Sequence, residues 1–126
     1  MTTRRALPPR RYTETFKLAF WGQTWHVNVG HYEDRDAARR AEAESQPLTP
    51  GEVFIAGGKA GTQTESTARD GAILLSLAMQ YGAPLDVIRH ALTREEDGKP
   101  SSLIGAVVDR MLTNLDVFGR QKESVE

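Results

Sequence analysis

The sequence predicts an α+β domain: a three-stranded antiparallel sheet followed by three helices packed on one face. Two observations predict it. Apolar residues alternate with polar ones in the first part of the chain, whereas from residue 62 onward they recur at helical spacing. Strands and helices that are separated along the chain are typical of antiparallel sheets covered by helices on one side. A length of 126 residues fits a single domain.

The strands come first. Residues 15–20 and 24–29 each alternate between apolar and polar or small side chains, and the turn at 21–23 separates them. This pattern predicts an antiparallel hairpin. The short apolar run at residues 52–56 predicts the third strand.

The helices follow. Thr62 and Glu65 have the spacing of a capping box and predict a helix start. The apolar period after them predicts a largely buried helix, with Gly82 just beyond its end. Pro84 is predicted to be the first residue of a short second helix over about 84–92. The stripe in residues 103–115 predicts a third helix.

We expect a single domain over residues 13–116, with an arm before it, an insertion within it and a tail after it. Residues 1–12 contain four arginines, no acid and two adjacent prolines, so we expect a flexible basic arm. Residues 35–50 are rich in charge and proline and show no apolar stripe. An exposed helical turn and a disordered loop are both open there, and we expect a mobile insertion that can be removed without loss of the fold. Residues 117–126 read as a polar tail.

Composition excludes several classes of function. The absence of cysteine removes thiolate catalysis, iron–sulfur ligation and disulfide exchange. With 16 basic and 17 acidic residues, the formal net charge of −1 indicates no global attraction to nucleic acid or anionic membranes. The longest nearly apolar run, residues 72–79, is too short for a transmembrane helix, and the arginines near the N-terminus do not resemble a signal peptide. We therefore expect a cytoplasmic protein without membrane contact.

The segment from Gly57 to Thr67 is the strongest candidate ligand site. Its glycines let the backbone approach a ligand, and the predicted helix start offers free amides and a positive potential that suit a nucleotide or a phosphate. It is not a P-loop, because Ala60 follows Lys59 where a Mg²⁺-binding Ser or Thr is required. The alternative is that the glycines only turn the chain. The candidate ligand-binding residues are Gly58, Lys59, Gly61, Thr62 and Arg69.

A second candidate surface lies in the N-terminal arm. Arg10, Arg11 and Tyr12 could contact a nucleic acid or a protein partner. Four charges and one aromatic side chain are few for a nucleic-acid arm, so a solubilising tail is the alternative.

Metal and catalytic sites are not predicted. The histidines at 26, 31 and 90 lack the partner spacing of a metal site. No Gly-x-Ser-x-Gly motif is present, and Ser76 is expected within a helix, bonded to a backbone carbonyl. We therefore predict no catalytic residue and no cofactor.

Five ordered blocks of the sequence resemble the TSCPD domain, which occurs in the C-terminal region of adenosylcobalamin-dependent ribonucleotide reductases and in short stand-alone bacterial proteins. The blocks are residues 10–12, 29–34, 51–55, 59–61 and 75–85, and the most specific is Ser-Leu-Ala-Met-Gln-Tyr-Gly-Ala-Pro-Leu at 76–85. The resemblance covers residues 10–112. Two departures are that residues 35–50 look like an insertion and that the cysteine-rich tail of those enzymes is missing.

The resemblance implies a non-catalytic accessory or binding module linked to deoxyribonucleotide synthesis, either acting with a reductase subunit in trans or reused elsewhere. The radical chemistry of the reductases needs a large barrel, cysteines and a cobalamin site, which a cysteine-free chain of this length does not hold. The alternative is a small nucleotide- or nucleic-acid-binding protein that uses the basic arm and the Gly57–Thr67 loop.

Overall fold

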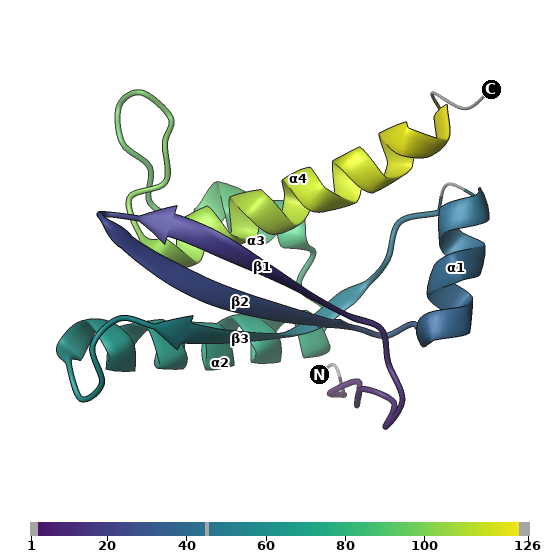
Figure 1. The fold of residues 1–126 in the computed structure, drawn as a ribbon, viewed down its shortest axis with the longest axis horizontal. Helices are drawn as coiled ribbons and strands as arrows, with labels where there is room; N and C mark the ends of the chain where they lie inside the picture. The colour runs from purple at the N-terminus through teal and green to yellow at the C-terminus, as the bar shows by residue number, and fades with distance from the viewer. Residues whose placement is uncertain (1–2, 45, 124–126) are drawn as a thin grey trace.

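The computed structural model describes residues 3–44 and 46–123, with side chains described up to residue 116. Its sheet contains β1 (Thr13–Phe20), β2 (Gln23–His31) and β3 (Pro50–Gly57), all antiparallel and in the order β1-β2-β3 (Figure 1). The predicted sheet is therefore confirmed. Alternate residues along β2, from Trp25 to Val29, are buried on the face that meets the helices.

The hairpin between β1 and β2 turns through only two residues. Phe20 pairs with Gln23, and Trp21 and Gly22 between them have φ angles of 50° and 76°. Two positive φ angles are characteristic of the type I′ turn, whose twist matches that of the flanking strands. Trp21 occupies a position that usually holds Asn, Asp or Gly, and its side chain is 80% exposed.

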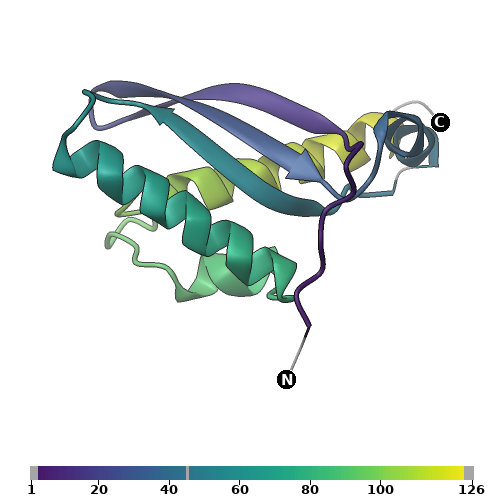
Figure 2. The ribbon, with the colours of Figure 1, turned by 90° about the horizontal axis from the view of Figure 1, so that it is seen from below.

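Helices α2 (Gln63–Gln80), α3 (Leu85–Ala91) and α4 (Leu103–Glu123) lie on the same side of the sheet (Figure 2). Their order and placement confirm the predicted fold class. Thr62 caps α2, because its side-chain oxygen accepts a hydrogen bond from the Glu65 amide at 3.2 Å. Gly82, at φ 97°, follows the end of α2. The main core joins the sheet to α2 and α4 and includes Trp25 and Met111.

A fourth helix, α1 (Arg35–Glu44), occupies the segment for which the sequence predicted a mobile insertion. Ala38 and Ala41 on this helix are buried with Leu48, and Tyr12 and Leu115 pack against them. The segment therefore has a packed face although its sequence shows no apolar stripe. The reason is that two alanines three residues apart bury one side of a helix without forming a strongly apolar stripe. The expectation that the segment is mobile and removable stays a prediction.

The described part of the predicted arm packs on the domain. The Arg5 amide donates to the Gln80 carbonyl at 2.8 Å, and its guanidinium lies 3.8 Å from the centre of the Tyr32 ring. The Tyr32 hydroxyl donates to the Arg5 carbonyl at 2.9 Å. At the other terminus, α4 extends into the predicted polar tail as far as Glu123, and residues 124–126 lie outside the described residues. None of the helices in the described chain is long and apolar enough to cross a membrane.

Candidate functional site

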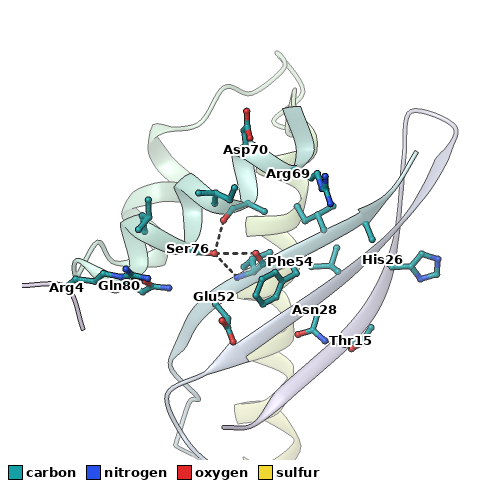
Figure 3. Close-up of a pocket in the computed structure, with 17 residues that line it drawn as sticks. Arg4, Thr15, His26, Asn28, Glu52, Phe54, Arg69, Asp70, Ser76 and Gln80 are labelled. Carbon is teal, nitrogen blue, oxygen red and sulfur yellow. Dashed lines mark hydrogen bonds between the residues drawn. The ribbon is translucent and has the colours of Figure 1, made fainter. Parts of the chain in front are cut away.

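A groove with a volume of about 770 Å³ lies between β3 and α2 (Figure 3). Its walls come from the open face of the sheet on one side and from α2 on the other. Part of β2 and the N-terminal arm complete it. The residues that line the groove include Arg4, Asn28, Phe54, Arg69, Ile73 and Ser76.

Two side chains of α2 cover the outer edge of β3 along this groove. The Ser76 hydroxyl accepts a hydrogen bond from the Val53 amide at 2.9 Å and donates to the Ala72 carbonyl at 2.8 Å, with the Val53 carbonyl at 3.3 Å (Figure 3). One turn later, the Gln80 side-chain amide donates to the Gly51 carbonyl at 2.9 Å. An unpaired strand edge is a template for pairing with other chains, so these two side chains protect it.

The bond from Ser76 to the Ala72 carbonyl is the one that the sequence predicted for a serine within a helix. The contact with Val53 was not predicted, because it joins elements that are 23 residues apart. Both Ser76 and Gln80 belong to the most specific block of the TSCPD resemblance. That block therefore includes residues that attach α2 to the sheet.

The open face of the sheet presents an exposed aromatic ring to the groove. Thr15, Asn28 and Phe54 are neighbours across the three strands, and the Asn28 amide nitrogen donates to the Thr15 hydroxyl at 3.1 Å (Figure 3). Phe54 is 60% exposed. Ile73 on α2 also lines the groove and is 56% exposed. Sequence analysis missed Phe54, although an apolar residue out of phase with Val53 and Ile55 on a half-buried strand was a usable signal.

Charged side chains lie along the groove. Arg4 donates from Nε to the Gln80 side-chain oxygen at 2.6 Å. Glu52 is ion-paired with Arg11 at 3.0 Å. Arg69 is loosely held, because its nearest carboxylate, Glu65, is 3.9 Å away and its side chain is 70% exposed. Asp70 also lines the groove.

The predicted Gly57–Thr67 loop begins where the groove ends, next to Ala56. Gly58 and Gly61 have φ angles of 67° and 78°, and Lys59 between them is exposed. The Thr62 hydroxyl donates to the Lys59 carbonyl at 2.6 Å while it also caps α2. Of the five predicted ligand-binding residues, only Arg69 is among the residues that line the groove.

The predicted contact residues of the arm are divided among different surroundings. Arg10 is exposed, and Arg11 is paired with Glu52 on the rim of the groove. The Tyr12 ring lies 5.4 Å from the buried His31 ring. Burial raises the pKa of the Tyr12 hydroxyl, and the nearby carboxylates of Glu14 and Glu42 add to the effect. Tyr12 therefore acts mainly as a packing residue between the arm and the second core.

Metal ligands do not gather in the part of the chain that the structure describes. It contains no group of three or more His, Cys, Asp or Glu side chains that could hold an ion. The buried His31 is close to a single carboxylate, with its Nε2 3.4 Å from Glu14 Oε1. The groove can therefore offer stacking, apolar contact, an amide and arginines to a ligand.

Comparison with known proteins links this chain to reductases. It is 34% identical over 85 residues to a vitamin B12-dependent ribonucleotide reductase of Rhodopirellula baltica, which is 68% of this chain and 7% of that protein. It is 32% identical over 93 residues to the enzyme of the same name from Bradyrhizobium diazoefficiens, which is 74% of this chain and 6% of that protein. The match thus spans a small part of each reductase. No solved structure matches the chain significantly.

The family comparison agrees with the residues described above. The sequence pattern of the TSCPD domain matches residues 3–115, which include the whole sheet, the edge-covering side chains of α2 and most of α4. The chain therefore belongs to the TSCPD domain family.

Proposed function

We propose that this chain is a non-catalytic binding module that acts together with a ribonucleotide reductase in deoxyribonucleotide synthesis. The observation that carries the proposal is the size of the match: the chain corresponds to 7% and 6% of two vitamin B12-dependent reductases. A chain without cysteine supplies no thiol for redox chemistry. We place this role in the cytoplasm.

The surface that such a module offers to a partner is distinctive. Apolar side chains on the open sheet face and on α2 are exposed beside one another, whereas several of the polar groups near the groove are engaged within the domain. Contiguous exposed apolar surface is typical of interaction sites. We therefore expect the partner to contact the groove between β3 and α2.

The proposal is tested with the reductase of Rhodopirellula baltica. The segment that matches this chain is deleted from that enzyme, and the chain is then supplied as a separate protein. We expect complex formation in sedimentation velocity and partial recovery of whatever reductase activity the deletion removes. The excised segment supplied in trans is the positive control. If that segment binds and rescues while this chain does neither at tens of micromolar, the proposed partnership is wrong.

A second candidate function is nucleotide or nucleic-acid binding by the Gly57–Thr67 loop and the basic arm. The observation in its favour is the exposed Lys59 between two glycines of positive φ, just before α2. In this function, Lys59→Ala weakens binding of ATP, dATP and inorganic phosphate several-fold and leaves the melting temperature nearly unchanged. Lys99→Ala, in another exposed loop, is the matched control. If Lys59→Ala binds these ligands as wild type does, the loop serves only to turn the chain.

A further inference from the structure

We propose that the groove between β3 and α2 is a nucleotide site, in which the base stacks on Phe54 and the phosphate lies near Arg69. The proposal shares nucleotide binding with the second candidate function but is independent of the Gly57–Thr67 loop. It does not require a reductase partner, and a protein partner on the same groove would compete with the nucleotide.

Phe54 is the first element of the site. Its ring is 60% exposed on the open face of a sheet whose opposite face is covered by helices. A nucleobase has a flat face that stacks favourably on exposed aromatic side chains, whatever the base. Ile73 lies on the opposite wall of the same groove and is 56% exposed. A planar ring stacked on Phe54 covers an apolar side chain that now faces solvent.

Asn28 supplies a polar group beside the ring. It is the cross-strand neighbour of Phe54, and one of its amide hydrogens is bonded to Thr15. An amide carries two donor hydrogens and an acceptor oxygen, so a donor and the acceptor are left for a ligand. Complementary donors and acceptors along one edge are the feature by which bases are recognised.

The charges of the groove leave Arg69 suited to an anion. Glu52 is neutralised by Arg11 at 3.0 Å, so it opposes a phosphate only weakly. Arg69 is 3.9 Å from Glu65 and 70% exposed, which leaves most of its donors to solvent. Arg4 lies at the other end of the groove, bonded to Gln80, and Asp70 follows Arg69 on α2 (Figure 3). A volume of about 770 Å³ is also large enough for a nucleotide, since ligand pockets are commonly about 300–1,000 Å³.

The test measures binding of AMP, adenosine and inorganic phosphate to the whole chain by calorimetry and by NMR titration. We expect Phe54→Ala to weaken AMP and adenosine binding at least five-fold, and Phe54→Leu to do so only slightly less, because both remove the aromatic face. Arg69→Gln is expected to weaken AMP several-fold and to leave adenosine unchanged. Trp21→Ala removes a still more exposed aromatic side chain outside the groove, and it should change binding of neither AMP nor adenosine.

Melting curves check that the variants fold, and we expect Phe54 to tolerate substitution because the residue is 60% exposed. Equal AMP affinity of wild type and Phe54→Ala would overturn the proposal. So would failure of both AMP and a hexathymidylate strand to bind at millimolar concentration.

A hexathymidylate titration separates a free nucleotide from a single strand. Tighter, Phe54-dependent binding of the strand than of AMP supports the same site and identifies a strand as the source of the base. Because no reductase is present in these titrations, their failure leaves the reductase experiment unaffected.

Discussion

Asp109 on α4 holds two other parts of the chain in place. Arg94, from the loop between α3 and α4, donates to Oδ2 at 3.0 Å and also binds Oδ1, and Arg89 of α3 donates to Oδ1 at 3.1 Å. The hydrogen bonds from Arg94 hold the pKa of Asp109 below its ordinary value despite some desolvation, with further lowering from Arg89. The same contact raises the pKa of Arg94.

Asp109→Asn should therefore destabilise the fold at neutral pH, by about 1–2 kcal/mol for a partly exposed charged pair. A depressed folded pKa means that this stabilisation is complete above the ordinary carboxyl pKa, about 4, and is lost as pH falls through the folded value. The difference between wild type and variant in urea unfolding should shrink accordingly in acid. Glu96→Gln, exposed on the same loop, is the control. A difference independent of pH would contradict this role.

Gly58 and Gly61 provide a matched pair of substitutions in the loop before α2. Both have positive φ, but a β-carbon at Gly58 would lie 2.9 Å from the buried Trp25 ring, whereas none of the described atoms lies within 4 Å of one at Gly61. Both alanine variants should carry backbone strain of about 1 kcal/mol, and Gly58→Ala should lose more because Trp25 must also shift. Thermal melts compare the two. Equal losses would show that the contact with Trp25 costs nothing.

At the scale of elements, the spacing of one helical turn along α2 matches the spacing of two residues along β3. Four residues of a helix rise about 6.0 Å, and two residues of a strand extend about 6.6–6.8 Å. Ser76 and Gln80 are therefore spaced to meet Val53 and Gly51, which are two residues apart on β3. Both side chains satisfy backbone groups that a sheet edge otherwise leaves to solvent or to another chain.

Removing either side chain should destabilise the domain. Ser76→Ala leaves the Val53 amide without its partner, and Gln80→Ala does the same for the Gly51 carbonyl, at a cost of about 1–3 kcal/mol each. Ser66→Ala, exposed on the same helix, is the control and should change stability little. Chemical denaturation measures all three. A Ser76→Ala variant as stable as Ser66→Ala would mean that the edge contact is not stabilising.

Helix α1 allows a test of whether its small core contributes to stability. Ala41 is 7% exposed and Ala43 on the same helix is exposed, so Ala41→Asp should lower the melting temperature by several degrees and Ala43→Asp should not. Replacing residues 35–50 by a short Gly-Ser linker should lower it further, because Leu48 and the bond from the Tyr32 amide to the Thr49 carbonyl are lost as well. An unchanged midpoint for the linker variant would instead support the mobile insertion that the sequence predicted.

At the scale of the whole molecule, three of the four arginines of the N-terminal segment make contacts within the domain. Arg4 binds Gln80, Arg5 lies over the Tyr32 ring, and Arg11 is paired with Glu52. These contacts join the arm to α2 and to the sheet. The charge that dominates the first twelve residues in sequence is therefore a weak guide to a nucleic-acid surface.

The whole chain should also lack reductase activity of its own. It contains no cysteine, so purified protein should not convert ribonucleotides to deoxyribonucleotides with or without added dithiol and adenosylcobalamin. Chromatographic product analysis measures this, with an intact vitamin B12-dependent reductase as the positive control. Turnover by homogeneous protein would contradict the proposed binding role.

The candidate site was only partly accessible to prediction. The sequence led to Arg69 and to the loop containing Lys59, because charge and glycine spacing are visible locally. It did not lead to Phe54 as a groove residue. The apolar side chain out of phase with Val53 and Ile55 was visible in the sequence, but the open sheet face beside α2 was not. The alanines of α1 were likewise passed over, because their burial depends on Tyr12 and Leu115 far away in the chain.

The sequence by itself determined the three strands, their hairpin and the ends of α2. Alternation, turn residues and caps act within a few residues and are legible without a partner surface. Only the tertiary structure decided that Ser76 meets Val53, that Phe54 and Ile73 line one groove, and that α1 buries its alanines. Each of those outcomes depends on which surfaces of distant segments come together, and that choice is made by the packing of the whole domain.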